Sequence, residues 1–267
     1  MLDHRTDLEA FENERVIPTS TKTRHILLIR HGQYDETFAE DSKRKLTKLG
    51  REQAKYTGQR IKEIIQGSEF NNEDFHNNKK VKVCQRGKCH VKAIHTSDMT
   101  RAKETADIIQ SYLPKSIHRS QPDPLLNETL PAPMIPIRPD IRNATEEIDQ
   151  NHDRVEQAFH KYCYRDMSNP TDIDTEKEDD DDDEGCDSED FDHEFEIIVG
   201  HGNVIRYMFC RSVQLPPEAW LRYSILNCSI TYLVIRPNGI VSARMLGDIG
   251  HMPYDHYTFS GYHGLKW

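Results

Sequence analysis

Short apolar runs alternate along this chain with longer amphipathic stretches. Three of the runs are Ile26–Ile29, Val91–Ile94 and Phe195–Val199. Each is too short for a typical helix and suits a strand that is buried on both faces in a parallel sheet. The spacing of apolar residues predicts helices from Thr47 to about Ile65, from Ser97 or Asp98 to a stop at Pro114, from Ala144 to Cys163 and from Val204 to Val213.

The segments 229–235 and 240–245 flank Pro237-Asn238-Gly239, which is a strong hairpin signal. Strands that alternate with helices and end in a hairpin predict an α/β fold, with a three-layer, mostly parallel sheet flanked by helices and a late β-hairpin. The proline-rich segment 121–139 is predicted to lack regular structure.

The length of 267 residues suits one domain with insertions rather than two domains. Low hydrophobic content and the polar segments predict the following organisation: a flexible N-terminal segment 1–22, a core domain 23–252 with a loop insert 66–90 and a disordered acidic insert 170–194, and an aromatic C-terminal tail 253–267.

The formal charge of -10 comes from one segment. Residues 172–194 hold 15 acidic residues and one lysine, a net of -14, which leaves +4 for the other residues. A mildly basic body agrees with anionic substrates, and no nucleic acid partner is expected. The acidic insert is interpreted as a solvated tether, with shielding of a cationic pocket or binding of a basic partner as the alternatives.

The six cysteines are expected to be reduced thiols in an intracellular compartment, because the sequence shows no signal peptide. No run approaches the ~18 apolar residues that a membrane-spanning helix needs. The sequence therefore predicts a soluble protein without a membrane segment.

Polar residues follow each of the three buried runs: Arg30-His31-Gly32, His95-Thr96-Ser97 and Gly200-His201-Gly202. The carboxyl ends of parallel strands lie at one edge of a sheet, where such folds bind ligands. With Arg101 in the first turn of the next helix, this edge would hold two guanidinium groups and up to three imidazoles. A phosphoryl group is the expected partner of such a cluster.

Two metal sites are the alternatives to this interpretation. His31, His95 and His201 could bind a metal, but the neighbouring arginines would repel a cation. Cys84 and Cys89 with His76 and His90 have an unusual spacing for zinc and are interpreted as part of a solvated loop. No metal and no cofactor are therefore expected.

Several blocks, taken in order, resemble the histidine phosphatase (phosphoglycerate mutase-like) superfamily. They are Leu28–Gly32, Leu46–Ala54, Thr96–Ala102 with Glu104-Thr105, and Gly200–Asn203. Residues 23–26, 33–34, 201–207, 216–222 and 229–239 are similar to a branch of mitochondrial Ser/Thr protein phosphatases. Upstream of Arg24 the membrane segment and the Trp-Asp-rich assembly motif of that branch are not seen.

The resemblance implies a function and a set of site residues. His31 would be the nucleophile that forms a phosphohistidine, Arg30, Arg101 and His201 would bind the phosphoryl group, and Glu128 would be the proton donor. The substrates would be phosphoserine and phosphothreonine proteins, and the chain would form a homo-oligomer. The location would be mitochondrial by resemblance, or cytoplasmic if the protein truly lacks an anchor.

Two alternatives remain open. A phosphatase or mutase for small molecules is one, although Gln33-Tyr34 replaces the acidic-plus-hydroxyl pair that resembles sugar-phosphate mutases. A non-catalytic scaffold is the other, although its usual sign, a lost nucleophile or arginine, is not found. His95 is interpreted equally well as a buried histidine behind the site or as a phosphate ligand.

Overall fold

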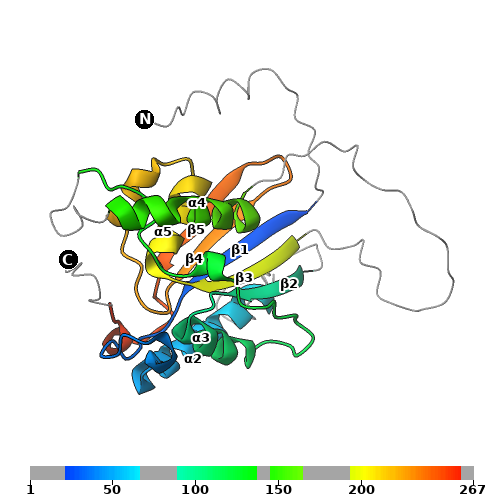
Figure 1. Ribbon diagram of the computed structural model, residues 1–267. Coiled ribbons are helices and arrows are strands. Elements are labelled where there is room, and N and C mark those ends of the chain that lie inside the picture. Colours follow the sequence, from blue (N-terminus) through cyan, green and yellow to red (C-terminus); the bar gives the residue numbers. More distant parts are fainter. Residues whose placement is uncertain (1–21, 67–88, 137–144, 165–192, 260–267) are drawn as a thin grey trace, which may run out of the picture.

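The computed structural model describes residues 22–66, 89–136, 145–164 and 193–259, which form a five-stranded sheet with helices on both faces (Figure 1). The order of the strands in the sheet is β2 (Cys89–Thr96), β3 (His193–Gly200), β1 (Thr23–Arg30), β4 (Ile230–Ile235) and β5 (Val241–Asp248). The three predicted buried runs are the adjacent strands β2, β3 and β1. The α/β fold class with its late hairpin is confirmed.

The strand directions explain where the polar strand ends meet. β1 and β2 both pair in parallel with β3, and the register places Arg30 opposite Gly200. β4 runs antiparallel to β1, and β5 pairs antiparallel with β4 as the predicted hairpin. The carboxyl ends of β1, β2 and β3 therefore lie at the same edge of the sheet.

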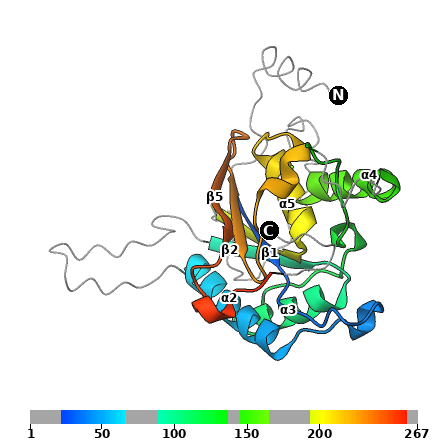
Figure 2. The same ribbon diagram turned by 90° about the vertical axis from the view of Figure 1, so that its left-hand side faces the viewer.

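Two pairs of helices cover the two faces (Figures 1 and 2). α2 (Lys48–Gln66) and α3 (Thr100–Gln110) lie on one face, and α4 (Thr145–Tyr162) and α5 (Gly202–Ser212) lie on the other. Thr47 caps α2 as predicted, because its Oγ1 accepts a hydrogen bond from the amide of Gly50 at 3.0 Å. The helices agree with the predicted ones to within a few residues.

Alternate residues of β1 supply the two hydrophobic cores. Ile26 and Leu28 pack in the layer of α4 and α5, whereas Leu27 and Ile29 pack in the layer of α2 and α3. All four are fully buried. A strand that is buried on both faces needs such a continuous apolar run, which is why the sequence pattern identified it.

The proline-rich segment contains one short regular element that was not predicted. Pro124–Leu126 form a turn of 3-10 helix, η2, and the Asp123 carboxylate accepts from the amide of Leu125 at 2.9 Å. Proline fits the first position of such a turn because it has no amide hydrogen to satisfy. The expectation that 121–139 lacks regular structure was therefore wrong for these residues.

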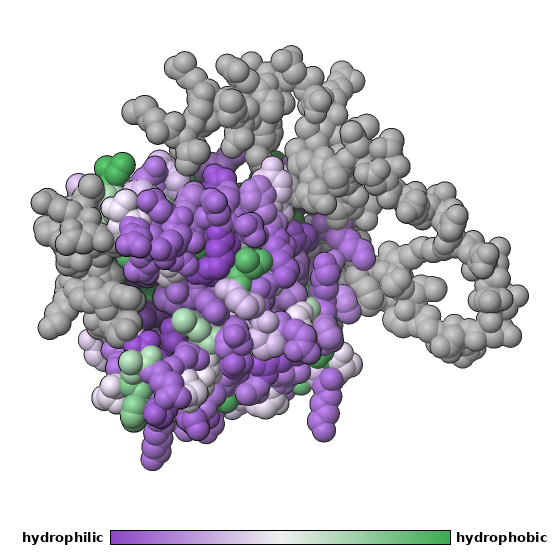
Figure 3. Space-filling view, viewed as in Figure 1, coloured by the Kyte–Doolittle hydropathy of each residue, from purple (hydrophilic) through white to green (hydrophobic). Residues whose placement is uncertain are grey.

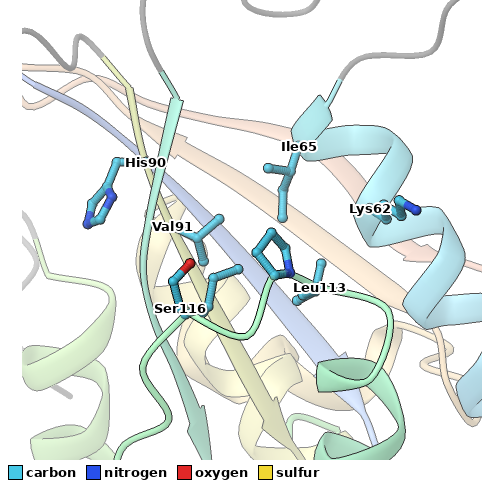
Figure 4. A pocket seen from close by; sticks show the side chains of 8 residues that line it. Lys62, Ile65, His90, Val91, Leu113 and Ser116 are labelled. Atoms are coloured by element: carbon cyan, nitrogen blue, oxygen red, sulfur yellow. The ribbon is translucent and has the colours of Figure 1, made fainter. Parts of the chain in front are cut away.

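The surface seen in Figure 3 is mainly hydrophilic, with small, separate hydrophobic patches. A cavity of about 300 Å³ lies beside the start of β2 and the loop after α3, where Ile65, Val91 and Leu113 supply apolar side chains (Figure 4). It lies at the amino end of the parallel strands, away from the polar edge. Within the described ranges, no helix is both long and apolar enough to cross a bilayer.

Several predicted segments lie wholly or mostly outside the described residues. They are the N-terminal segment 1–22, the loop insert 66–90, the acidic insert 170–194 and the end of the aromatic tail 253–267. The predictions for these segments stay predictions. Tyr254–His256, within the tail, form a further 3-10 turn, η7.

Truncation of a fully buried strand residue tests the two-layer core. Ile197 on β3 is 0% exposed, so Ile197→Ala should lower the free energy of unfolding by about 2–5 kcal/mol, through lost burial and the cavity left behind. Urea denaturation measures this change. Ile240→Ala is the control, because a half-exposed side chain should cost only about 0.5 kcal/mol or less. Equal losses in both variants would contradict the assignment of the core.

Candidate active site

The loops that follow β1, β2 and β3 are joined by backbone hydrogen bonds. The amide of His31 donates to the carbonyl of Gly200 at 3.0 Å, and the amide of Ser97 donates to the carbonyl of Val199 at 3.0 Å. The helices α3 and α5 begin close to these loops. The parallel sheet thus brings together three segments that are far apart in the sequence.

The imidazole of His31 is held in one tautomer. Its Nδ1 lies 2.8 Å from the carbonyl oxygen of Gly32, which can only accept, so Nδ1 carries the hydrogen. Nε2 therefore carries no hydrogen, and its lone pair accepts a hydrogen bond from Nε of Arg101 at 3.2 Å. The side chain is 2% exposed. This lone pair is in the form that a nucleophile needs.

Gly32 allows the chain to turn close to α2. A Cβ atom at this position would lie 2.5 Å from the carbonyl oxygen of Gly50, which is closer than atoms can approach without a shift of the backbone. The amide of Gly32 also donates to Thr105 Oγ1 on α3 at 3.0 Å. The loop that carries His31 is therefore fixed against both helices of this layer.

Electrostatics favour the neutral form of His31. Burial, and then the charges of Arg101 and Arg30, lower its pKa well below the ordinary value of 6.5. The hydrogen bond to the Gly32 carbonyl acts in the opposite direction but is the smaller effect. His31 is therefore an uncharged imidazole at neutral pH.

Two buried guanidinium groups border His31. Arg30 is 6% exposed, and its Nη1 donates to the carbonyl of Ile225 at 2.5 Å, while Nε has no hydrogen-bond partner among the described residues. Arg101 is 3% exposed, and its Nη1 donates to Asp41 Oδ1 at 3.2 Å. Arginine remains charged even when burial lowers its pKa, so the site holds a concentrated positive charge.

His201, directly before α5, is fully buried, and its ring centroid lies 5.0 Å from that of His31. Asn127 Oδ1 accepts from the amide of Asp98 at 3.0 Å and from the Ser97 hydroxyl at 2.7 Å. Since that hydroxyl hydrogen is used, Ser97 must accept from Nε2 of His201 at 2.8 Å. His201 is therefore a donor through Nε2.

The pKa of His201 is also lowered well below 6.5, by burial first and then by the charges of Arg101, His31 and Arg30. Its Nδ1 has no hydrogen-bond partner among the described residues.

Glu128 lies at the start of α5. Its Oε1 and Oε2 are 3.3 and 3.5 Å from the amide of Asn203, and Oε1 also accepts from the amide of Thr129 at 3.2 Å. The side chain is half-buried, and its charge acts on the pKa of both Arg30 and Arg101.

Arg154 fixes the turn that precedes Glu128. Its Nη1 donates to the carbonyls of Pro124, Leu125 and Asn127 at 2.8–3.1 Å.

The structure thus brings together His31, Arg30, Arg101, His201 and Glu128, the five residues that the sequence singled out for catalysis and phosphate binding. It places His95 elsewhere: Nε2 lies 3.7 Å from Glu196 Oε2, and the ring lies 5.0 Å from that of Tyr162. No group of three metal-binding side chains occurs in the described part of the chain.

Several residues of the site were not predicted from the sequence. Asn227 Nδ2 donates to the carbonyl of His31 at 3.0 Å. The Tyr34 ring lies 4.7 Å from Cζ of Arg101 and meets the His31 ring edge-on at 5.1 Å. Tyr34 adjoins one of the polar strand ends, which was a usable signal, whereas Asn227 and Asp41 lie in segments without any pattern.

Comparisons with known proteins agree with this geometry. Residues 186–246 match the model of the histidine phosphatase superfamily (branch 1). The chain is 42% identical over 235 residues to the mitochondrial serine/threonine-protein phosphatase PGAM5 of Xenopus laevis, covering 86% of this chain and 67% of that protein. It is 41% identical over 240 residues to human mitochondrial PGAM5, covering 89% and 67% of the two chains.

Among solved structures, Bacillus stearothermophilus YhfR superposes with a TM-score of 0.51 at 18% identity, covering 85% of this chain and 98% of YhfR, which supports the fold. The matched region spans about two thirds of the length of the PGAM5 relatives. With this identity to them, the chain belongs to the histidine phosphatase superfamily and, within it, to the PGAM5-like Ser/Thr protein phosphatases.

Proposed function

We propose that this phosphatase hydrolyses phosphoserine and phosphothreonine esters in two displacements, with a covalent phosphohistidine on Nε2 of His31 between them. The observation that supports this most directly is the neutral, buried His31, whose Nε2 lone pair lies 3.2 Å from Nε of Arg101. A nucleophile and a charge-stabilising donor are thus adjacent. Phosphoryl transfer depends mainly on such positioning and charge stabilisation.

In the first step Nε2 of His31 attacks phosphorus in line, and an N–P bond forms as the bond to the serine or threonine oxygen breaks. Glu128 gives its proton to that oxygen, so the alcohol leaves uncharged. The imidazole becomes positively charged, and the Gly32 carbonyl, 2.8 Å from Nδ1, stabilises the hydrogen on that nitrogen.

In the second step water attacks the phosphorus and the N–P bond breaks. Glu128 takes a proton from the water, which restores its acid form for the next cycle. His31 returns to the neutral tautomer and inorganic phosphate is released. Two displacements at one histidine divide a difficult reaction into two easier ones.

The charge on the transferring group is stabilised by the surrounding donors. Arg30 and Arg101 supply guanidinium N–H groups to the equatorial oxygens, and His201 is a further polar contact of the same group. No metal or cofactor has a role in this scheme. Because the nearby positive charges are buried, they act in a medium of low polarity, where their effect is stronger than in water.

The biological setting is proposed from the relatives. The PGAM5 relatives are described as mitochondrial, so we infer a mitochondrial location for this chain, with phosphorylated proteins as its substrates. We also propose a homo-oligomer. Cell fractionation would test the mitochondrial location, and sedimentation of the purified protein would test the homo-oligomer.

Removal of the nucleophile should abolish turnover. His31→Ala is expected to reduce hydrolysis of a phosphothreonine peptide and of p-nitrophenyl phosphate to background, measured as phosphate release. His160→Ala, on the exposed side of α4, should keep the wild-type rate. Near wild-type activity of His31→Ala would refute the mechanism. A wild-type enzyme that acted on 3-phosphoglycerate in preference to the peptide would instead contradict the substrate class.

The role of Glu128 predicts a dependence on the leaving group. An alkoxide needs a proton to leave, whereas p-nitrophenolate is stable without one. Glu128→Gln should therefore reduce kcat/KM, which reports the steps up to the phosphoenzyme, by about 10²–10⁴ for a phosphoserine peptide, a range typical of general acids. It should reduce kcat/KM for p-nitrophenyl phosphate far less.

Glu147→Gln is the matched control for Glu128→Gln, because Glu147 contacts the same loop, accepting from the amide of Leu130 at 3.3 Å. It should leave both rates nearly unchanged. An equal loss of kcat/KM on the two substrates in Glu128→Gln would show that Glu128 does not protonate the leaving oxygen.

The lowered pKa of His31 and His201 predicts how pH acts on the protein. In the unfolded chain these imidazoles bind protons below about pH 6.5, but in the folded protein they stay neutral to lower pH. The unfolded state then binds more protons, so the free energy of unfolding should fall as pH decreases below about 6.5.

Ring-proton NMR shifts of His31 and His201 should consequently stay constant between pH 8 and about 6. Titration of His31 near pH 6.5 would contradict the electrostatic account.

A further inference from the structure

The guanidinium of Arg101 has two functional edges. Its Nε–H points at His31 Nε2, and Nη2 lies 3.2 Å from Met99 Sδ. Nε and Nη2 together form the side of the guanidinium fork that can contact two phosphoryl oxygens at once. The remaining nitrogen, Nη1, donates to Asp41 Oδ1 at 3.2 Å. Because the Asp41 carboxylate occupies Nη1, the Nε and Nη2 edge is the one left for the phosphoryl group.

Asp41 is itself fixed by the helix that carries Arg101. It belongs to the 3-10 turn η1 (Asp41–Lys43), and its Oδ2 accepts from the amide and the hydroxyl of Thr100 at 2.8 and 2.9 Å. α3 begins at Thr100, and the preceding residue, Met99, supplies no side-chain cap. A carboxylate from another segment thus performs the capping that a helix N-terminus favours.

The two oxygens of one carboxylate therefore join the start of α3 to the side chain one residue further along. The Asp41 side chain is 40% exposed, whereas that of Arg101 is 4% exposed. The carboxylate contacts Arg101 from the solvent side. The buried edge of the guanidinium, Nε and Nη2, therefore stays directed toward His31. The Tyr34 ring, 4.7 Å from Cζ, limits movement of the guanidinium plane in another direction.

We propose that Asp41 is a positioning residue for the phosphatase reaction, which holds Nη1 of Arg101 so that the Nε and Nη2 edge faces the phosphoryl group on His31. This inference rests on the proposed roles of His31 and Arg101. Asp41 acts through Arg101 and does not touch the substrate. A misaligned guanidinium would stabilise the transition state less while the fold remained intact.

Asp41→Asn tests this role with little change to the helix cap. The asparagine oxygen still accepts from Thr100, but its amide presents hydrogens to Nη1 of Arg101, which is also a donor. We expect kcat on a phosphothreonine peptide to fall by about tenfold, less than the ~10²–10³ lost when a charge-stabilising donor is removed outright. The loss should appear mainly in kcat, and the melting temperature should change little.

Glu40→Gln is the matched control, because it removes a charge from the adjacent residue. Glu40 is exposed and pairs with Lys43 at 2.7 Å, within its own loop. It should leave kcat within about twofold of wild type, since surface substitutions away from special contacts have small effects. An equal loss in Glu40→Gln and Asp41→Asn would mean that the effect comes from the general charge of the loop, which would overturn the proposal.

A double-mutant cycle decides whether Asp41 acts through Arg101. In an Arg101→Ala background, Asp41→Asn should cause no further loss of kcat, because the side chain that it positions is gone. The proposal is overturned if Asp41→Asn has wild-type kcat, if its loss is confined to KM, or if the loss is unchanged in the Arg101→Ala background. Should His31→Ala remain active, the proposed mechanism fails; should only the Asp41 variants behave like wild type, this inference alone fails.

Discussion

Several positive charges are buried around one neutral imidazole, and the rest of the site depends on this arrangement. Arg30 and Arg101 border His31, and Arg206 lies nearby, 3% exposed, with its pKa lowered to about 10 by burial and by the charge of Arg30. Buried charges are costly unless they are paired and hydrogen-bonded. Asp41 offsets part of this cost through its ion pair with Arg101. A dianionic phosphoryl group would complete the compensation, which makes binding of that group the natural function of the site.

The fold produces this cluster through the direction of its strands. β1, β2 and β3 end at one edge, so the residues that follow them meet although they are separated by long stretches of sequence. Backbone hydrogen bonds between the loops, such as His31 to Gly200 at 3.0 Å, fix their relative positions. The apolar cores on both faces make the sheet rigid, and a rigid support is what precise placement of catalytic groups requires.

Much of this architecture could be predicted because buried strands and amphipathic helices leave periodic signals. The runs at Ile26–Ile29 and Phe195–Val199 identified two central strands, and the polar residues after them identified His31 and His201. Arg101 was found from its place in the first turn of a helix. Glu128 was found only from the resemblance to a family, because its proline-rich segment has no periodicity that could place it.

Other features could not be predicted, because they depend on contacts between segments. Asp41 lies in a polar loop that resembles many solvated loops. Its proposed role in positioning Arg101 depends on its hydrogen bonds to Thr100 and Arg101. The tautomer of His201 follows from a chain of bonds through Ser97 and Asn127. The position of His95, beside Glu196 and not at the site, depends on which face of β2 its side chain occupies.

The covalent intermediate is the central claim, and its chemical identity can be measured directly. A phosphothreonine peptide is mixed with the enzyme, and the reaction is quenched in alkali, in which phosphohistidine is stable. The phosphorylated residue is then located by mass spectrometry, and phosphorus NMR assigns the nitrogen that carries the phosphate. We expect phosphate on Nε2 of His31, formed at a rate at least equal to kcat. Phosphate on another residue, on Nδ1, or no covalent intermediate at any time point would contradict it.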